Sequence, residues 1–264
     1  MNYLQILQKT VENIFGYKNI PTNRKREIRE STASALEESF TREFNSRDDK
    51  IEPNLVSIGN HSTSDFGSGL LLTTNGLILT AYHTIKEWEE DWTEIRKIGP
   101  TEDNIFGEFA SRIEGYFASD HKKTYQMDPT FYVKDTEHDI AIVKAIMPND
   151  PRGSGIRLSP NQLKENQRLW KYSNSYRTTK PERSHVVSNN YDINIGAEFT
   201  PDTFVILSES EAGDSGSPIT NNNDDLVGVI IAGGKVSRHN FVYGTKSEYI
   251  RKLIEKAATE LRKI

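Results

Sequence analysis

The stretch Glu211-Ala212-Gly213-Asp214-Ser215-Gly216-Ser217-Pro218 decides how this chain is interpreted. It places a serine between two glycines, with an aspartate directly before it. Glycine adopts backbone conformations that residues with a Cβ avoid. Two nearby N–H groups of such a loop can point at one spot and bind a developing oxyanion. The stretch therefore suits a serine nucleophile on a tight loop, although an ordinary β-turn has a similar composition.

Two upstream segments favour the nucleophile. Thr80-Ala81-Tyr82-His83 follows an apolar run at 69–79, and Asp139 begins the apolar segment Asp139-Ile140-Ala141-Ile142-Val143. The chain order is therefore His, Asp, Ser, which is the order of chymotrypsin. An α/β-hydrolase would need Gly-x-Ser-x-Gly with its histidine last, and Ser217 stands where the final glycine should be.

Together these motifs resemble those of the trypsin-like serine peptidases of the chymotrypsin fold. The motifs are Gly-Asp-Ser-Gly at 213–216, Thr-Ala-x-His at 80–83 and Asp-Ile-Ala at 139–141. The segment Gly67-Ser68-Gly69 and the lack of cysteines are closer to the HtrA-type and bacterial intracellular branch than to secreted digestive enzymes.

The resemblance covers about residues 54–264 and implies a mainly β fold, a double six-stranded β-barrel with helical ends. We expect an N-terminal helical extension at 1–53, a first barrel at 54–147, a second barrel at 154–245 and a C-terminal helix at 246–264.

Hydrophobic periodicity gives the same outline. Apolar residues at helical spacing occupy 4–15, and strand patterns begin at Leu55. The Asn75-Gly76 pair predicts a hairpin turn between strands at 68–73 and 77–80. In the second half we expect strands near 167–173, 184–188, 193–199, 203–208 and 226–232, followed by a helix over 247–263.

The resemblance assigns a role to each candidate catalytic residue. Ser215 is the nucleophile, His83 is the general base and then the general acid, and Asp139 fixes the histidine tautomer. The backbone N–H groups of Gly213 and Ser215 form the oxyanion hole. Asp135 is a rival to Asp139, and the apolar strand that follows Asp139 favours the latter.

The substrate-binding residues are also implied by the resemblance. Glu209 occupies the position of the S1 pocket floor, where a carboxylate would favour Lys or Arg at P1; an exposed glutamate on a shifted loop is the alternative. Phe241 lies near the far pocket wall, and its ring could fill the pocket. Ile231-Ala232-Gly233 resembles the segment that pairs with substrate as an added strand. The family often has serine at the position of Ile231, where its hydroxyl supports the catalytic aspartate.

Composition limits the remaining classes. The 264 residues are 35% hydrophobic and 27% charged, with a net charge of −5, which does not favour nucleic-acid binding. The chain has no cysteines and no His spacing typical of a metal site, so we expect no disulfide, metal or cofactor. No secretory signal or membrane span is recognisable, and a cytoplasmic location is expected.

Activation is the open question at this stage. In secreted relatives, cleavage frees an amine that pairs with the aspartate before the serine, here Asp214. The segment Asp48-Asp49-Lys50-Ile51 resembles such a cleavage site, but the first strand begins too soon after Ile51 for that amine to reach Asp214. The alternative is control by a protein partner or by ordering of the loop that carries Ser215, with residues 1–50 as the natural contact.

The sequence therefore predicts a serine endopeptidase that works through an acyl-enzyme, in bacterial defence or protein quality control. The alternative is a catalytically weak or inactive binding or scaffold module with a peptidase fold. The departures at Ile231 and Phe241 leave room for this alternative.

Overall fold

The protein is described from a computed structural model. The structure describes residues 51, 54–60, 65–86, 113–117, 120–146, 156–172, 181–195 and 198–263. The predicted helical extension at 1–53, including its partner-binding arm, and the segment at 148–153 between the predicted barrels therefore lie almost wholly outside the described residues.

The first half of the chain forms a closed antiparallel barrel. Its strand order is β1-β2-β3-β6-β5-β4, and pairing between β1 and β4 closes it. Closure gives every strand a paired neighbour on both sides, so no strand stands at the edge of an open sheet. The strands are β1 Leu55–Asn60, β2 Asp65–Leu71, β3 Leu77–Ala81, β4 Ile113–Phe117, β5 Asp120–Asp135 and β6 Ile140–Ile146.

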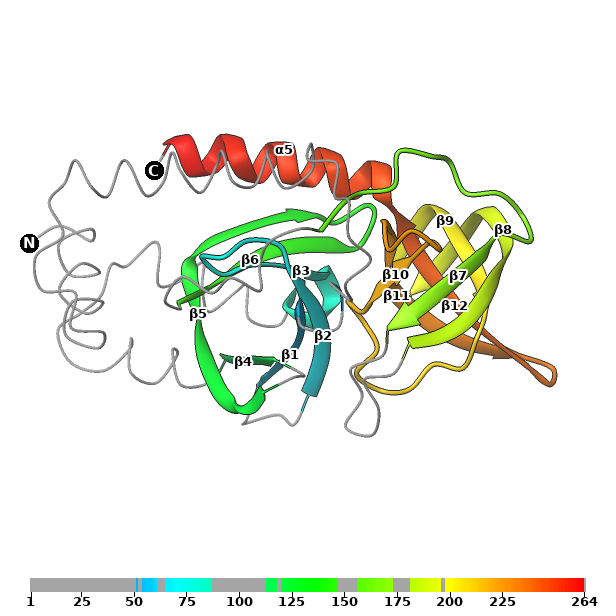
Figure 1. Ribbon diagram of the computed structural model, residues 1–264, viewed down its shortest axis with the longest axis horizontal. Helices are drawn as coiled ribbons and strands as arrows, with labels where there is room; N and C mark the ends of the chain where they lie inside the picture. Colours follow the sequence, from blue (N-terminus) through cyan, green and yellow to red (C-terminus); the bar gives the residue numbers. More distant parts are fainter. Residues whose placement is uncertain are drawn as a thin grey trace, which may run out of the picture.

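The second half repeats this topology beside the first (Figure 1). The order is β10-β11-β12-β9-β8-β7, closed between β7 and β10. The predicted double six-stranded barrel is thus confirmed. The strands are β7 Arg168–Tyr172, β8 Pro181–Ile195, β9 Glu198–Leu207, β10 Pro218–Thr220, β11 Leu226–Val236 and β12 His239–Lys246.

The prediction of separate strands at 184–188 and 193–199 is wrong. One long strand, β8, runs through Ser188-Asn189-Asn190, and the segment 193–199 spans the junction of β8 and β9. Polar residues of this kind usually mark a turn. Here irregularities in the β8–β9 register absorb them, because a bulge accommodates extra residues without ending a strand.

The β2–β3 hairpin that leads to His83 has the Asn-Gly turn that the sequence predicts. Gly76 has a φ of 96°, which a residue without a Cβ adopts readily. The Gly76 N–H donates to the Thr73 carbonyl at 3.2 Å. Thr73 Oγ1 in turn accepts the Leu77 N–H at 3.1 Å, so the turn fixes where β3 begins.

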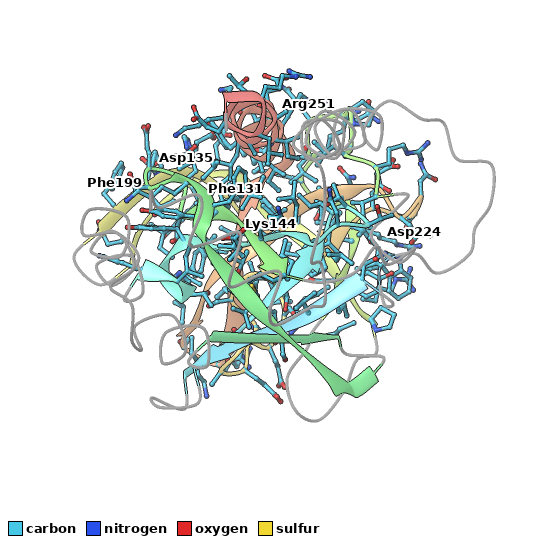
Figure 2. All side chains as sticks on the ribbon, turned by 90° about the vertical axis from the view of Figure 1, so that its left-hand side faces the viewer. Phe131, Asp135, Lys144, Phe199, Asp224 and Arg251 are labelled. Carbon is cyan, nitrogen blue, oxygen red and sulfur yellow. The ribbon has the colours of Figure 1, made fainter. Side chains whose placement is uncertain are left out.

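Apolar residues on both faces of the strands hold the first barrel in place. Adjacent residues of β3, such as Ile78 and Leu79, belong to different buried clusters, as the two-residue period of a strand requires. Phe131, labelled in Figure 2, belongs to the larger cluster, whereas Phe199 lies exposed at the periphery. The near-continuous apolar run of β6 is explained by this burial on both faces.

The C-terminal helix α5, Ser247–Lys263, matches the predicted helix closely. It runs along the outside of the first barrel (Figure 1). Its apolar face joins a cluster that contains Leu70 and Ile142 of the first barrel and Leu226 and Val229 of the second. The buried helix residues are Ile250, Leu253, Ile254, Ala257, Ala258 and Leu261.

No helix within the described part of the chain is long and apolar enough to span a membrane.

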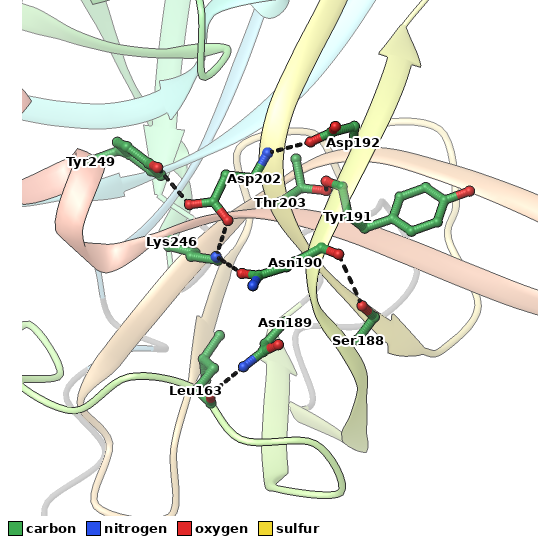
Figure 3. A network of polar contacts seen from close by, with 10 residues as sticks. All are labelled: Leu163, Ser188, Asn189, Asn190, Tyr191, Asp192, Asp202, Thr203, Lys246 and Tyr249. Atoms are coloured by element: carbon green, nitrogen blue, oxygen red, sulfur yellow. Dashed lines mark hydrogen bonds and ion pairs between the residues drawn. The ribbon is translucent and has the colours of Figure 1, made fainter.

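A polar network fastens the start of α5 to β9 (Figure 3). Tyr249 donates its phenol O–H to Asp202 Oδ2 at 2.6 Å, and Lys246 pairs with the other oxygen of Asp202. Burial alone would raise the pKa of the Asp202 carboxyl, but the hydrogen bonds from Lys246 and Tyr249 outweigh it and leave the pKa below 3.8. Burial and the bond to Asp202 raise the pKa of the Tyr249 phenol.

This network predicts how stability depends on pH. The folded pKa of Asp202 is lower than the unfolded one, so its contribution is present above about pH 3.8 and is lost as pH falls through the folded value. We expect Asp202→Asn to lower the free energy of unfolding by about 1 kcal/mol at pH 7, a value reduced for partial exposure. Urea unfolding of both proteins from pH 7 to pH 3 measures this. A difference that stays constant over that range would contradict the assignment.

Candidate active site

His83, Asp139 and Ser215 meet where the two barrels face each other. The His83 ring lies in the short 3-10 turn Tyr82–Thr84 after β3. Its Nε2 is 2.8 Å from Ser215 Oγ, and its Nδ1 is 2.6 Å from Asp139 Oδ2. The backbone N–H of His83 also donates to Asp139 Oδ1 at 2.8 Å, so the carboxylate holds both the ring and the backbone of the histidine.

The turn before β6 places Asp139, and the second barrel supports that turn. Asp139 has a φ of 53°, a left-handed conformation that aspartate tolerates better than most residues. Thr245 of β12 donates its hydroxyl to the carbonyl of His138, and the His138 ring stacks on Tyr249 of α5 at 3.5 Å. Contacts from the second barrel and helix therefore fix a carboxylate of the first.

Asp135, the sequence rival of Asp139, lies in the same turn but serves a different partner. Its Oδ2 is 2.8 Å from His138 Nδ1, and its Oδ1 accepts the N–H groups of Glu137 and His138. It caps the turn rather than facing His83. The His138 side chain is only 12% exposed, because it packs on Tyr249.

Ser68 of the first barrel holds the loop that carries Ser215. The Ser68 N–H donates to the Ser215 carbonyl at 2.7 Å, and its hydroxyl donates to the Gly213 carbonyl at 2.6 Å. Gly216 fits against the same strand: a Cβ there would lie 1.9 Å from the Ser68 carbonyl oxygen, and its φ is +87°. This close approach explains why the residue after the serine is glycine.

The two amides predicted to form the oxyanion hole have no acceptor among the residues that the structure describes. Gly213 has a φ of 97°, which turns its backbone as only glycine does readily. Both Gly213 and Ser215 are half-buried. Their N–H groups are therefore available to an incoming oxygen.

Sequence reasoning missed Lys171 of β7. Its ammonium lies 3.3 Å from Asp214 Oδ2, directly before the serine, and both side chains are almost fully buried. It also donates to the carbonyl of Glu209. The available signal was the pattern Leu169-Trp170-Lys171-Tyr172, which places the lysine two residues after a core leucine and so on the same face of the strand.

The five predicted substrate residues lie on three segments of the second barrel: the loop after β9, β11 and β12. Glu209 follows β9; its side chain is exposed, and its carbonyl, not its carboxylate, meets Lys171. Ile231, Ala232 and Gly233 lie on β11, past the last residue of β11 that pairs with β10, Val229. A Cβ on Gly233 would lie 2.3 Å from the Ser210 side chain, so these two segments touch at that point.

Phe241 and Ile231 differ in how deeply their side chains are buried. Phe241 of β12 pairs with Gly234 and Leu207 and is half-buried. Ile231 is 1% exposed. Both oxygens of Asp139 are held by His83, and no third donor to them occurs among the described residues. With isoleucine rather than serine at position 231, His83 is the only described residue that donates to the Asp139 carboxylate.

No group of three or more His, Cys, Asp or Glu side chains that could hold a metal ion occurs in the described ranges. The chemistry open to this arrangement is nucleophilic attack by a hydroxyl next to an oriented imidazole, beside two free amides.

Comparison with known proteins gives the class. A family model described as Trypsin matches residues 43–254, and this chain belongs to that family. The structure is similar to the apo MamO protease domain from Magnetospirillum magneticum, with a TM-score of 0.55 and 16% identity over 77% of this chain and 97% of that chain. It is also similar to the active form of the Rv3671c protease from M. tuberculosis, with a TM-score of 0.54 and 14% identity over 82% and 93%. No curated protein matches the chain.

The contact between Gly216 and Ser68 gives a test of the interface. We expect Gly216→Ala to lower the free energy of unfolding by at least about 2 kcal/mol, because the new methyl group collides with backbone at a left-handed φ. Gly234→Ala is the matched control: its Cβ meets only the Tyr243 ring, at an ordinary 3.6 Å. Urea denaturation measures both, and equal effects would reject the tight fit.

Proposed function

We propose that this chain is a serine endopeptidase that acts through Ser215, His83 and Asp139. The observation that carries the proposal is the continuous line of hydrogen bonds from Ser215 Oγ through the His83 ring to Asp139. The trypsin-family match and the protease neighbours support the same class.

In this proposal Ser215 Oγ attacks the carbonyl carbon of a peptide bond while His83 Nε2 takes its proton. The amides of Gly213 and Ser215 bind the oxyanion of the tetrahedral intermediate. His83 then gives the proton to the leaving amine, and an acyl-enzyme remains. Water then attacks the acyl carbonyl carbon while His83 Nε2 takes its proton, and His83 returns this proton to Ser215 Oγ as the acyl–oxygen bond breaks and the acid leaves. Asp139 accepts the Nδ1–H, which keeps Nε2 free to act as the base.

The free part of β11 suits an extended peptide. Ile230 still bonds on the side that faces β10, donating its N–H to the Ser217 carbonyl at 2.9 Å and accepting the Gly216 N–H at 2.7 Å. Beyond Ile230, β11 pairs with β12 on one side and with no described strand on the other. An extended substrate can add there as a strand, with main-chain hydrogen bonds to Ile231 and Gly233. Backbone recognition of this kind favours a peptide over a small ester.

The role of Asp139 is tested against its neighbour. We expect Asp139→Asn to lower kcat about 10⁴-fold, because the amide stabilises the wrong histidine tautomer. Asp135→Asn, the matched control, keeps its acceptor oxygen toward His138 and should remain within about tenfold of wild type. The rate of labelling by a fluorophosphonate at Ser215 gives the same comparison without a known substrate.

The same reagent separates an enzyme from a scaffold. Labelling of the wild type that is lost in Ser215→Ala supports a serine hydrolase. An unlabelled wild type would favour the binding or scaffold module.

The preference for a basic P1 residue stays a prediction, and Glu209 tests it. If its carboxylate receives a P1 cation, Glu209→Gln should lower kcat/KM for Arg and Lys peptides about tenfold and leave Ala peptides unchanged. A P1 peptide library measures this. Equal loss for all peptides, or no loss, would show that Glu209 is an exposed glutamate outside the pocket.

A further inference from the structure

Lys171 occupies a position where the barrel interior calls for an apolar residue. Along β7 it shares a face with Leu169, which belongs to the interior cluster of the second barrel. Its side chain is only 4% exposed. A buried ammonium is costly unless oxygens surround it, so a lysine here needs a specific reason.

The oxygens around Lys171 belong largely to the serine loop. The ammonium lies 3.3 Å from Asp214 Oδ2 and donates to the Glu209 carbonyl. The third oxygen is Glu182 Oε2 on the neighbouring strand β8, at 3.0 Å, and that side chain is 45% exposed. Asp214 and the Glu209 carbonyl thus both lie between β9 and β10, on the segment that contains Ser215.

Asp214 is the centre of that loop. Its side chain is 1% exposed, and Oδ2 accepts the Glu211 N–H at 3.0 Å. Its own N–H donates to the Glu211 carbonyl at 3.1 Å, and its carbonyl accepts the Ser217 N–H at 2.9 Å. Gly213 and Ser215 are its direct neighbours, so any movement of Asp214 displaces both oxyanion amides and the nucleophile.

We propose that Lys171 is a positioning residue: its ammonium holds Asp214 inside the second barrel and so keeps the Gly213 and Ser215 amides and the Ser215 hydroxyl in the reacting arrangement. The inference rests on the proposed peptidase function. Removing one partner of a buried ion pair leaves an uncompensated charge. Without the ammonium, the Asp214 carboxylate gains by turning toward water, and the loop moves with it.

This assignment also answers the question of activation. The cation that orders the loop is a side chain fixed on β7, so no newly cut chain end is required. Intact protein should therefore react, and the mass of its adduct should equal that of the uncut chain plus the fluorophosphonate, less the hydrogen fluoride that leaves.

The central experiment compares Lys171→Met with wild type. Methionine has a similar length and no charge. We expect the rate of fluorophosphonate labelling at Ser215 to fall at least about 100-fold, as when an oxyanion donor is lost. On a cleaved peptide, kcat should fall far more than KM rises. Lys144→Met, a lysine of β6 on the first barrel, is the matched control and should label at the wild-type rate.

Two further variants separate positioning from loss of folding. Lys171→Arg keeps the charge and should label faster than Lys171→Met. The double variant Lys171→Met/Asp214→Asn removes both charges, so it should also label faster than Lys171→Met alone. Circular dichroism and thermal unfolding verify that each variant is folded. Losses that simply add in the double variant would overturn the proposal.

Hydrogen exchange measures how often the backbone of the loop that carries Ser215 opens, and this measurement does not depend on activity. We expect peptides that cover 209–217 to exchange at least about tenfold faster in Lys171→Met, with β1–β6 unchanged. If the wild type is not labelled, the proposed function fails, while exchange still tests the role of Lys171. If Lys171→Met is labelled and exchanges at the same rates as wild type, the inference about Lys171 is overturned and the peptidase proposal still stands.

Discussion

The site depends on a reciprocal fit between the two barrels. Ser68 of the first barrel holds the carbonyls of Gly213 and Ser215 in the second. Thr245 of the second barrel holds the turn that carries Asp139 in the first. Neither barrel alone completes the arrangement, because each supplies the hydrogen bonds that fix the other's reactive group. The absence of a side chain at Gly216 is what allows the barrels to approach this closely.

The two carboxylates near Ser215, those of Asp139 and Asp214, have different partners. Asp139 is held by His83 and lies at the barrel interface. Asp214 lies deeper and meets the ammonium of Lys171, which replaces a core side chain of β7. A buried carboxylate needs such partners, since desolvation penalises an isolated charge. Two acidic residues near one serine therefore serve different purposes: one orients the imidazole, and the other anchors the loop that bears the hydroxyl.

The helix α5 connects these features to the rest of the fold. Its apolar face packs in a cluster shared with both barrels, and Tyr249 joins its first turn to Asp202 and to His138. His138 directly precedes Asp139 in the sequence, so the stacking of its ring on Tyr249 connects the helix to the turn that carries Asp139. A C-terminal segment remote from the chemistry in sequence thus supports it in space.

The sequence by itself determined the reactive residue types, their order, the two-barrel class and the final helix. The residue types, their order and the helix follow from short motifs and from periodicity, which are local properties of the chain, and the two-barrel class follows from the family resemblance that those motifs carry. Only the tertiary structure decided the roles of Ser68, Lys171 and Thr245 and the continuity of β8 through Ser188-Asn189-Asn190. A serine, a lysine and a threonine on strands carry no local sign of their partners. Those partners lie far along the chain and come within reach only when the barrels close and pack together.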